Sequence, residues 1–211
     1  MSYQVKEIFY TVQGEGAQSG RPAVFLRFSG CNLWSGREED RASAKCTFCD
    51  TDFVGTDGDR GGRYSTPDDL VAELDRVWLG EGAGVRFVVC TGGEPLLQLD
   101  DALIQALHAA GYEIAVETNG TVEPPAGIDW LCVSPKAGNE LVVRSGQELK
   151  LVYPQERQDP ESMLALDFAH FYLQPMDGAH LDANTQATLA YCMAHPRWKF
   201  SLQSHKVLGV Q

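Results

Sequence analysis

VRFVVCTGGEPLLQLDDALIQALHAAGYEIAVETNG, Val85–Gly120, is the stretch that decides the fold class. It opens with the short apolar run Val85–Cys90 and closes with a second one, Tyr112–Thr118. Apolar runs of this length are typical of buried strands. Between them, the amphipathic segment DDALIQALHAA predicts a helix that ends at Gly111. A strand, a helix and a second strand in this order predict a parallel βα unit.

The same alternation continues on both sides of this unit. A helix is predicted from Pro67 to Trp78. Thr66 suits its N-cap, and the carboxylates of Asp68 and Asp69 suit its first turn. The remaining predicted elements are strands at Ala23–Ser29, Asp129–Ser134, Glu148–Tyr153 and Phe168–Gln174, a helix from about Asp182 to Ala194, and a short last strand at Trp198–Gln203.

The number of units limits the architecture. A chain of 211 residues is long enough for one domain with a sizeable core. Six βα units are too few for a closed eight-unit barrel, which usually needs about 250 residues. The pattern therefore predicts an α/β protein that is either an open, partial parallel βα barrel of about six strands or a doubly wound sheet.

Charge and hydropathy exclude several classes of function. The formal net charge is −12, and an acidic surface repels phosphate backbones and anionic lipids, so neither nucleic acid nor a membrane is an expected partner. The first residues, MSYQVKEIFYTVQGEG, contain no apolar core behind a basic start, and no apolar run is long enough to span a bilayer. We expect a cytoplasmic protein.

Polar or glycine-rich segments follow the predicted strands. They read GCNLW, TGGEP, ETNG, SPK and QPMDG in chain order. Parallel βα folds build their active sites at the carboxyl ends of the strands. Ordinary turn chemistry explains the glycines, but it explains poorly the charged residues found there, which are Glu94, Glu117, Lys136 and Asp177. The pattern favours an enzyme.

The six cysteines fall into two groups. Three lie in apolar runs and are expected to be small buried hydrophobic residues: Cys90, Cys132 and Cys192. The other three, Cys31, Cys46 and Cys49, lie in polar, turn-rich sequence directly after a predicted strand. In a cytosolic chain, disulfides are not the expected reason for such a group.

Three nearby thiols admit more than one interpretation. A structural zinc site usually has four ligands, and a zinc site with three protein ligands usually includes histidine, but the nearest histidine in sequence is His108. A redox pair at Cys46 and Cys49 would leave Cys31 unused. A four-iron, four-sulfur (4Fe–4S) cluster held by three thiolates would keep one iron open for a substrate or cofactor. The βα context favours the cluster over zinc.

At these residues the chain resembles a known family. Cys46-Thr47-Phe48-Cys49 preserves the second half of the C-x3-C-x-aromatic-C motif of radical S-adenosylmethionine enzymes, which follows the first strand of a partial βα barrel. The first gap has fourteen residues, which is similar to one branch, the 7-carboxy-7-deazaguanine synthases. The resemblance covers FYTVQGEG, R-x-x-G-C, CDT, TGGEP, ETNG, SPK, QPMDG and SLQSHK. It implies a single domain over residues 1–211 with an inserted loop at 32–45.

The resemblance implies a 4Fe–4S cluster on Cys31, Cys46 and Cys49, with S-adenosylmethionine chelating the open iron. Gly92, Gly93 and Glu94 match the segment that lines the amino group of the cofactor, since glycines permit close approach of the backbone. The complete set implied for the cofactor is Phe48, Cys49, Asp50, Gly92, Gly93, Glu94, Glu117, Ser134, Pro135, Lys136, Gln174, Pro175, Met176 and Asp177.

The implied substrate is 6-carboxy-5,6,7,8-tetrahydropterin. Its carboxylate needs a cationic partner, and Arg27, inside an apolar strand, is the leading candidate. The other residues expected to contact it are Val12, Gln13, Gly14, Glu15, Thr91, His205, Lys206 and Gln211. The resemblance also implies Mg²⁺ at Thr51, since a hydroxyl suits a hard cation.

The implied reaction is a radical ring contraction to 7-carboxy-7-deazaguanine with loss of ammonia, a carbon–nitrogen lyase activity in queuosine biosynthesis. The implied partners are the pterin, an electron donor such as a flavodoxin, and a second copy of the chain in a homodimer. Two alternatives remain. One is a radical activase acting on a partner protein, and the other is a zinc-binding interaction module.

Overall fold

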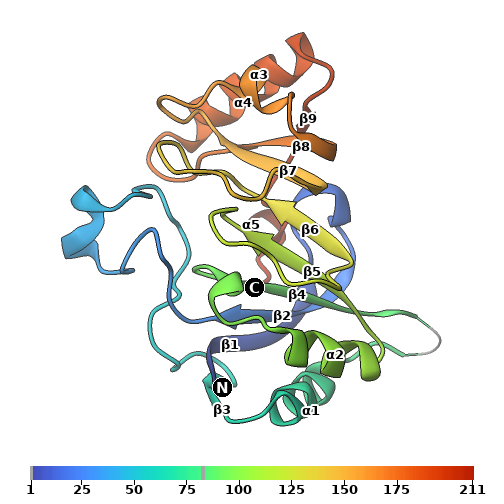
Figure 1. Ribbon diagram of the computed structural model, residues 1–211. Helices are drawn as coiled ribbons and strands as arrows, with labels where there is room; N and C mark the ends of the chain where they lie inside the picture. The colour runs from blue at the N-terminus through green and yellow to red at the C-terminus, as the bar shows by residue number, and fades with distance from the viewer. Residues whose placement is uncertain (1, 82–83) are drawn as a thin grey trace.

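Nine strands form one mixed sheet in this computed structural model, which describes residues 2–81 and 84–211 (Figure 1). The strands lie side by side in the order β3 (Gly62–Tyr64), β1 (Tyr3–Val12), β2 (Pro22–Phe28), β4 (Arg86–Gly92), β5 (Tyr112–Thr118), β6 (Trp130–Val133), β7 (Ser145–Tyr153), β8 (Asp167–Pro175) and β9 (Lys199–Phe200).

All six strands expected from the sequence are present and parallel, from β2 through β4 to β8. Their order along the sheet is their order in the chain, as in a barrel, whereas a doubly wound sheet reverses its order at a switch point. The sheet ends in two free edges, β3 and β9, so it does not close. The expectation of an open, partial barrel is confirmed. The expected last strand is shorter than predicted and covers only Lys199–Phe200.

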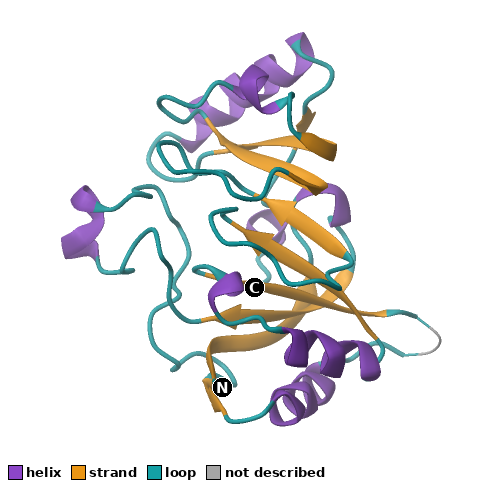
Figure 2. Ribbon diagram, viewed as in Figure 1, coloured by secondary structure: helices purple, strands orange, loops and turns teal. Residues whose placement is uncertain are grey.

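Helices cover the sheet at its two ends, as Figure 2 shows. They are α1 (Pro67–Val77), α2 (Asp101–Ala109), α3 (Pro160–Met163), α4 (Leu181–Ala194) and α5 (Ser204–Leu208), with 3₁₀ turns η1 (Gly16–Gln18), η2 (Glu38–Ser43) and η3 (Pro95–Leu97). None of these helices, within residues 2–81 and 84–211, has the length and apolarity to cross a bilayer.

The prediction of six complete βα units is wrong in one respect. The connections between β5 and β6 and between β6 and β7 contain no helix, and all of their residues are described. Both connections are rich in turn-forming Gly, Pro and Asn rather than in apolar residues at helical spacing. The middle of the sheet therefore has loops where the two ends have helices (Figure 2).

The strand β1 has no counterpart among the expected elements. It runs antiparallel to β2 and carries a register shift between Val5 and Glu7. A shift of this kind breaks the alternation of apolar and polar residues by which a strand is identified. At its end begins the segment TVQGEG, which β1 delivers to the concave face of the sheet.

Local signals set the helix boundaries as expected. Thr66 caps α1, since its side chain accepts a hydrogen bond from the Asp69 N–H. The chain turns after α2 at Gly111, whose φ of 81° favours glycine. Both helices pack their apolar sides on one face of the sheet, in a core that includes Leu74 of α1 and Leu107 of α2. The three cysteines expected to be buried are buried, and Cys90 and Cys192 belong to this core: Cys90, Cys132 and Cys192.

Candidate active site

A cavity of about 400 Å³ opens at the carboxyl ends of the parallel strands. Its walls come from β2, β4, β5, β7 and β8, from the cysteine segment after β2 and from the residues after β9. Along each strand, alternate side chains face this side of the sheet. In β4, the sequence changes from apolar Phe87 and Val89 to polar Thr91 as the strand reaches the cavity. The predicted convergence of strand ends is thus present.

Three free thiols share one wall of the cavity. Cys31 follows β2, and its sulfur accepts a hydrogen bond from the Leu33 N–H at 3.4 Å. Cys46 and Cys49 lie on the loop beyond the insertion, and burial raises the pKa of the thiols of Cys31 and Cys46. Backbone N–H groups directed at sulfur are a usual part of iron–sulfur sites. The three thiols, with the N–H donor at Cys31, fit a cluster held by three cysteines.

The three thiols fit a cluster because they line the same cavity, and not because they form a metal site that is already arranged. Within residues 2–81 and 84–211, no group of three His, Cys, Asp or Glu side chains is arranged to hold a metal ion. The ammonium of Lys136 lies near Cys46 and Cys49 and donates to the carbonyl and hydroxyl oxygens of Ser134, both at 2.7 Å. Burial lowers the pKa of this ammonium.

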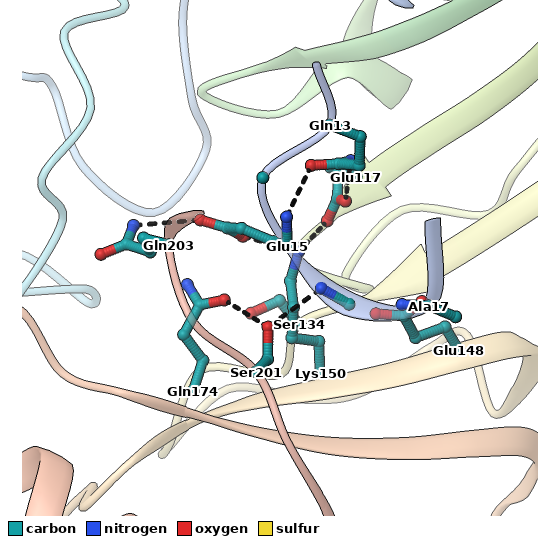
Figure 3. Close-up of polar contacts among 12 residues, drawn as sticks. Gln13, Glu15, Ala17, Glu117, Ser134, Glu148, Lys150, Gln174, Ser201 and Gln203 are labelled. Atoms are coloured by element: carbon teal, nitrogen blue, oxygen red, sulfur yellow. Dashed lines mark hydrogen bonds and ion pairs between the residues drawn. The ribbon is translucent and has the colours of Figure 1, made fainter. Parts of the chain in front are cut away.

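A buried ion network lines the cavity, and Figure 3 shows its residues. The Lys150 ammonium of β7 binds the carboxylates of Glu15 at 2.7 Å and Glu117 at 2.9 Å, and its side chain is only 4% exposed. Burial would raise the pKa of Glu15, but the charge of Lys150 outweighs it and the pKa is lowered. Burial would likewise lower the pKa of Lys150, but the surrounding acidic groups raise it well above its usual value. Glu15 and Lys150 are therefore charged at neutral pH.

The segment TVQGEG crosses the concave face and ends on this network (Figure 3). The Gly16 N–H donates to Ser201 Oγ at 2.9 Å, and the Ala17 N–H donates to Glu148 Oε2 at 3.0 Å. Gly16 has a φ of 63°, and a Cβ on it would lie 1.9 Å from Glu148 Oε1. Only glycine fits here. The turn places Glu15 beside Lys150 and Gln13 beside Glu117, to which the Gln13 amide donates at 3.2 Å.

Arg27 of β2 faces the cavity and is mostly buried. Its Nε donates to Glu7 at 2.7 Å, and its side chain is 18% exposed. The guanidinium carbon lies 5.8 Å from the centre of the Phe9 ring. Its two terminal nitrogens form no hydrogen bond with any residue in the described part of the chain. Arg27 thus keeps donors free on the cavity side, and it does not lie on an exposed edge.

Residues after β9 cover part of the cavity. The Lys206 ammonium bridges the carboxylates of Asp50 at 2.7 Å and Asp177 at 2.5 Å. The Gln203 amide donates to Glu15 at 3.0 Å and to Asp50 at 3.2 Å. These contacts join the cysteine loop, the TVQGEG segment and the end of β8. Burial lowers the pKa of the nearby His205, which favours the neutral imidazole.

Similarity to known proteins agrees with this site. The Radical SAM superfamily model matches residues 41–149, a span that includes Cys46 and Cys49. A 7-carboxy-7-deazaguanine synthase of Caulobacter vibrioides is 66% identical over 210 residues, with both chains fully covered. Enzymes of the same name from Bradyrhizobium diazoefficiens and Bacteroides thetaiotaomicron are 60% and 41% identical, again over both full lengths. The chain belongs to the 7-carboxy-7-deazaguanine synthase family.

A solved structure supports the same family at the level of the fold. The crystal structure of QueE from Escherichia coli superimposes with a TM-score of 0.71 and 28% identity, over 96% of this chain and 94% of that one. The chain is therefore a radical S-adenosylmethionine protein of the 7-carboxy-7-deazaguanine synthase family, with its cysteine segment at the carboxyl edge of an open sheet.

Most residues that the resemblance implies for this family line the cavity, from all the expected segments. They are Val12, Gln13, Glu15, Arg27, Cys31, Cys46, Phe48, Cys49, Asp50, Thr51, Thr91, Gly92, Gly93, Glu117, Ser134, Lys136, Gln174, Pro175, Asp177, His205, Lys206 and Gln211. Their position is compatible with the expected roles, which stay predictions.

Glu94 does not line the cavity, and its expected contact with the cofactor stays a prediction. Its side chain is fully buried and accepts hydrogen bonds from Thr118 Oγ1 at 2.7 Å and from the Asn119 N–H at 2.8 Å. It also accepts from the Leu96 N–H at 3.1 Å. The carboxylate thus ties the turn after β4 to the end of β5. In this family member it holds the TGGEP turn in position.

Three further expected residues do not line the cavity: Gly14, Pro135 and Met176. Gly14 supports the wall through its carbonyl, which accepts hydrogen bonds from the N–H and hydroxyl of Ser204. The Met176 carbonyl accepts from Asn184 of α4 at 2.8 Å. These contacts of both residues are made by their backbone carbonyls.

Several lining residues were not expected from the sequence. They include Lys6, Glu7, Trp34, Asn119, Lys150 and Gln203. Lys150 carried a usable signal, because it is a cation at an alternate position of the apolar strand ELKLVY, as Arg27 is in AVFLRFS. Glu7 carried none, since the register shift in β1 hides its direction.

Proposed function

We propose that the chain converts 6-carboxy-5,6,7,8-tetrahydropterin to 7-carboxy-7-deazaguanine with release of ammonia, as a carbon–nitrogen lyase in queuosine biosynthesis. One observation carries the proposal: a single cavity of about 400 Å³ presents three thiols on one wall and a guanidinium with free donors on another. The names of the full-length relatives support the reaction. The cavity suits a small anionic substrate next to a cluster-bound cofactor.

As a member of the radical S-adenosylmethionine superfamily, the chain takes a 4Fe–4S cluster and S-adenosylmethionine. Cys31, Cys46 and Cys49 would hold the cluster. Together, the two cofactors supply one-electron chemistry that starts with abstraction of a hydrogen atom from the substrate. The contribution of the chain is to position both molecules and to compensate charge.

The glycines after β4 bring the backbone close to the thiols. A Cβ on Gly93 would lie 2.6 Å from the Cβ of Cys31 and 2.3 Å from the Gly30 carbonyl oxygen. The backbone carbonyls of this turn are available to accept from the ammonium of the cofactor. Asp50, Ser134 and Asp177 lie at the remaining cofactor wall.

The proposed pterin contacts also line the cavity. The free guanidinium nitrogens of Arg27 would bind the substrate carboxylate, and Thr91 lies at the adjacent position on β4. Gln13 is held by Glu117, which in turn is held by Lys150, so the amide is fixed in orientation before any substrate binds. A fixed donor and acceptor pair suits the hydrogen-bonding edge of a pterin.

Arg27→Gln is expected to lower kcat/KM by roughly 10- to 150-fold, because a hydrogen bond to a charged group contributes about 1.5–3 kcal/mol. Arg27→Lys keeps the charge beside Glu7 but loses the planar pair of donors, so it should recover only part of the loss. Steady-state kinetics measure both. Arg86→Gln, which removes an exposed arginine from the start of β4, is the matched control. Equal kinetics for Arg27→Gln and wild type would rule out this contact.

We also propose a Mg²⁺ ion bound through the Thr51 hydroxyl together with substrate oxygens. Thr51 lines the cavity beside the cysteine loop, and its hydroxyl is a ligand that hard cations accept. Chelation of Mg²⁺ from cluster-loaded protein should slow turnover, and added Mg²⁺ should restore it. Unchanged rates in both the depleted protein and Thr51→Ala would argue against the ion.

Three further expectations complete the proposal, on the domain organisation, the oligomeric state and the electron donor. We propose that residues 1–211 act as a single domain with the insertion at 32–45, that the active form is a homodimer, and that a flavodoxin supplies the electron. The family resemblance is the support for the dimer and the donor. Analytical ultracentrifugation and turnover with purified flavodoxin would test them.

Product analysis tests the function itself. Protein reconstituted anaerobically with iron and sulfide is given reductant, S-adenosylmethionine, Mg²⁺ and the carboxytetrahydropterin, and the products are identified by mass spectrometry. We expect a deazaguanine carboxylate, ammonia and little net loss of S-adenosylmethionine. Cofactor cleavage without a deazaguanine would favour an activase instead. Bound zinc without acid-labile sulfide would favour the interaction module.

A further inference from the structure

The hydroxyl of Ser201 joins two segments that line the cavity, although Ser201 itself does not line it (Figure 3). Ser201 directly follows β9, and its N–H donates to the Leu173 carbonyl of β8 at 2.8 Å. The residue is only 3% exposed. Its Oγ accepts a hydrogen bond from the Gly16 N–H at 2.9 Å and donates one to Gln174 Oε1 at 3.1 Å. One buried hydroxyl therefore contacts both the TVQGEG segment and the end of β8.

The single proton of this hydroxyl determines which way the Gln174 amide is turned. A serine hydroxyl donates one proton and accepts through two lone pairs, and a backbone N–H such as that of Gly16 can only donate to it. Within residues 2–81 and 84–211, the Gln174 oxygen is the only acceptor that the hydroxyl reaches. If the amide turned over, its NH₂ group would face the hydroxyl, and the buried proton would have no acceptor. Because unsatisfied buried donors are costly, the hydroxyl selects one amide orientation.

The selected orientation leaves the NH₂ group of Gln174 unused. Gln174 lines the cavity, and Figure 3 shows its nitrogen turned away from Ser201. In the described part of the chain, this nitrogen forms no hydrogen bond. It is also not one of the fully enclosed atoms there that lack a partner, which are Glu148 Oε1 and Trp198 Nε1. The NH₂ group is therefore a free donor that is open to the cavity.

The turn η1 does not depend on Ser201 alone. The Gly16 N–H donates to Ser201, but the next N–H, that of Ala17, donates to Glu148 of β7 at 3.0 Å. Removing the hydroxyl would therefore leave one of the two contacts that hold this turn. The effect of Ser201 on the Gln174 amide can thus be tested in a chain that keeps its fold.

We propose that Ser201 is a positioning residue for S-adenosylmethionine: its hydroxyl holds the Gln174 amide with the NH₂ group toward the cavity, as a hydrogen-bond donor to the cofactor. The ribose, the adenine ring and the carboxylate of the cofactor all offer acceptors. A donor that is oriented beforehand need not be ordered when the cofactor binds. The inference rests on the proposed function, which places the cofactor at the wall that carries Asp177, three residues after Gln174.

The test measures the affinity for S-adenosylmethionine by isothermal titration calorimetry. The protein is loaded with its cluster but receives no reductant, so binding is observed without turnover. Gln174→Glu keeps an oxygen for the Ser201 proton and replaces the cavity-facing NH₂ group by a second oxygen. Ser201→Ala keeps the Gln174 amide but leaves it free to turn. Iron and acid-labile sulfide contents show whether each variant is loaded, and thermal unfolding shows whether it folds.

Each substitution has a matched control outside the cavity lining. Gln147→Glu makes the same change of charge on β7, at a side chain whose oxygen accepts from the Leu131 N–H at 2.7 Å. Ser162→Ala removes a hydroxyl that donates to the Asp159 carbonyl at 2.6 Å in α3. Both controls should bind S-adenosylmethionine as wild type does.

Gln174→Glu is expected to weaken binding roughly tenfold or more, because an acceptor of the cofactor would then face an anionic acceptor. Ser201→Ala should weaken it roughly 3- to 10-fold, because the cofactor must then order a free amide side chain. In the double variant, Ser201→Ala should add little to the loss from Gln174→Glu, since a carboxylate presents an oxygen in either orientation. A serine with a merely structural role would cause the same loss in both backgrounds.

Wild-type affinity in either single variant would overturn the role of Ser201, and in Gln174→Glu it would show that the amide oxygen faces the cavity. An equal loss from Ser201→Ala in the wild-type and Gln174→Glu backgrounds would overturn it as well. If Ser201→Ala does not fold, Gln174→Glu carries the test. A wild-type chain that does not bind S-adenosylmethionine would instead overturn the proposed function together with this inference, so the two failures are distinguishable.

Discussion

Replacement of Cys46 by alanine is expected to abolish turnover while leaving the chain folded. The Cys46 thiol lines the cavity with Cys31 and Cys49, and its side chain is 5% exposed. With two thiolates left, the cluster loses one of its three protein ligands. Reconstituted Cys46→Ala should show reduced iron and sulfide, no deazaguanine by mass spectrometry and no cleavage of S-adenosylmethionine.

Cys192→Ala is the matched control for this prediction. Cys192 lies on α4, its thiol is similarly buried at 8% exposed, and it is not part of the cavity lining. It should load a full cluster and turn over like wild type. Product formation by Cys46→Ala would contradict the assignment of the three ligands. Loss of activity in both variants would indicate general damage from cysteine replacement.

The second large effect is expected for Lys150→Met, on stability. Lys150 neutralises Glu15 and Glu117, and neither carboxylate is more than 20% exposed. Removing one member of a buried ion network leaves charge uncompensated, which typically costs about 3–5 kcal/mol. In a domain of this size, that corresponds to a loss of roughly 6–20 °C in Tm. Thermal and denaturant unfolding of the cluster-free chain measure it.

Lys199→Met is the control, since Lys199 is an exposed lysine on the edge strand β9, which is separated from β7 by β8. It should leave Tm within a few degrees of wild type. Lys150 depresses the pKa of Glu15, so this stabilisation is present above the usual pKa of a glutamate and is lost as the pH falls. The difference in Tm between wild type and Lys150→Met should therefore become smaller at acidic pH. If Lys150→Met had the same Tm as Lys199→Met at neutral pH, the network would not contribute to stability as predicted.

The strands that form the site could be predicted from the sequence, because each apolar run is a local pattern. Arg27 shows how far this reasoning extends. A cation in the apolar run AVFLRFS indicates a functional side chain, and the structure places it at the cavity. The role of its partner Glu7 could not be predicted, because the register shift in β1 breaks the alternation that would show which way the side chain points.

Contacts between distant segments account for most of what the sequence did not predict. Gly16 is bound by Ser201, and Gln203 is bound by Glu15 and Asp50, across more than a hundred residues each. No periodicity encodes such pairs. The hydrogen bonds that Glu94 accepts from Thr118 and Asn119 are another such case, since they join the turn after β4 to the end of β5.

The insertion at 32–45 has its two ends joined, which has a consequence for how this lineage can vary. Because one carbonyl, that of Leu33, holds both Lys45 and Cys46, the two ends of the loop stay together whatever number of residues lies between them. Doubling a flexible loop costs only about 0.6 kcal/mol in closure entropy. Insertions and deletions in this loop should therefore be tolerated during evolution. Cysteine spacing would then be a poor search key for distant homologues.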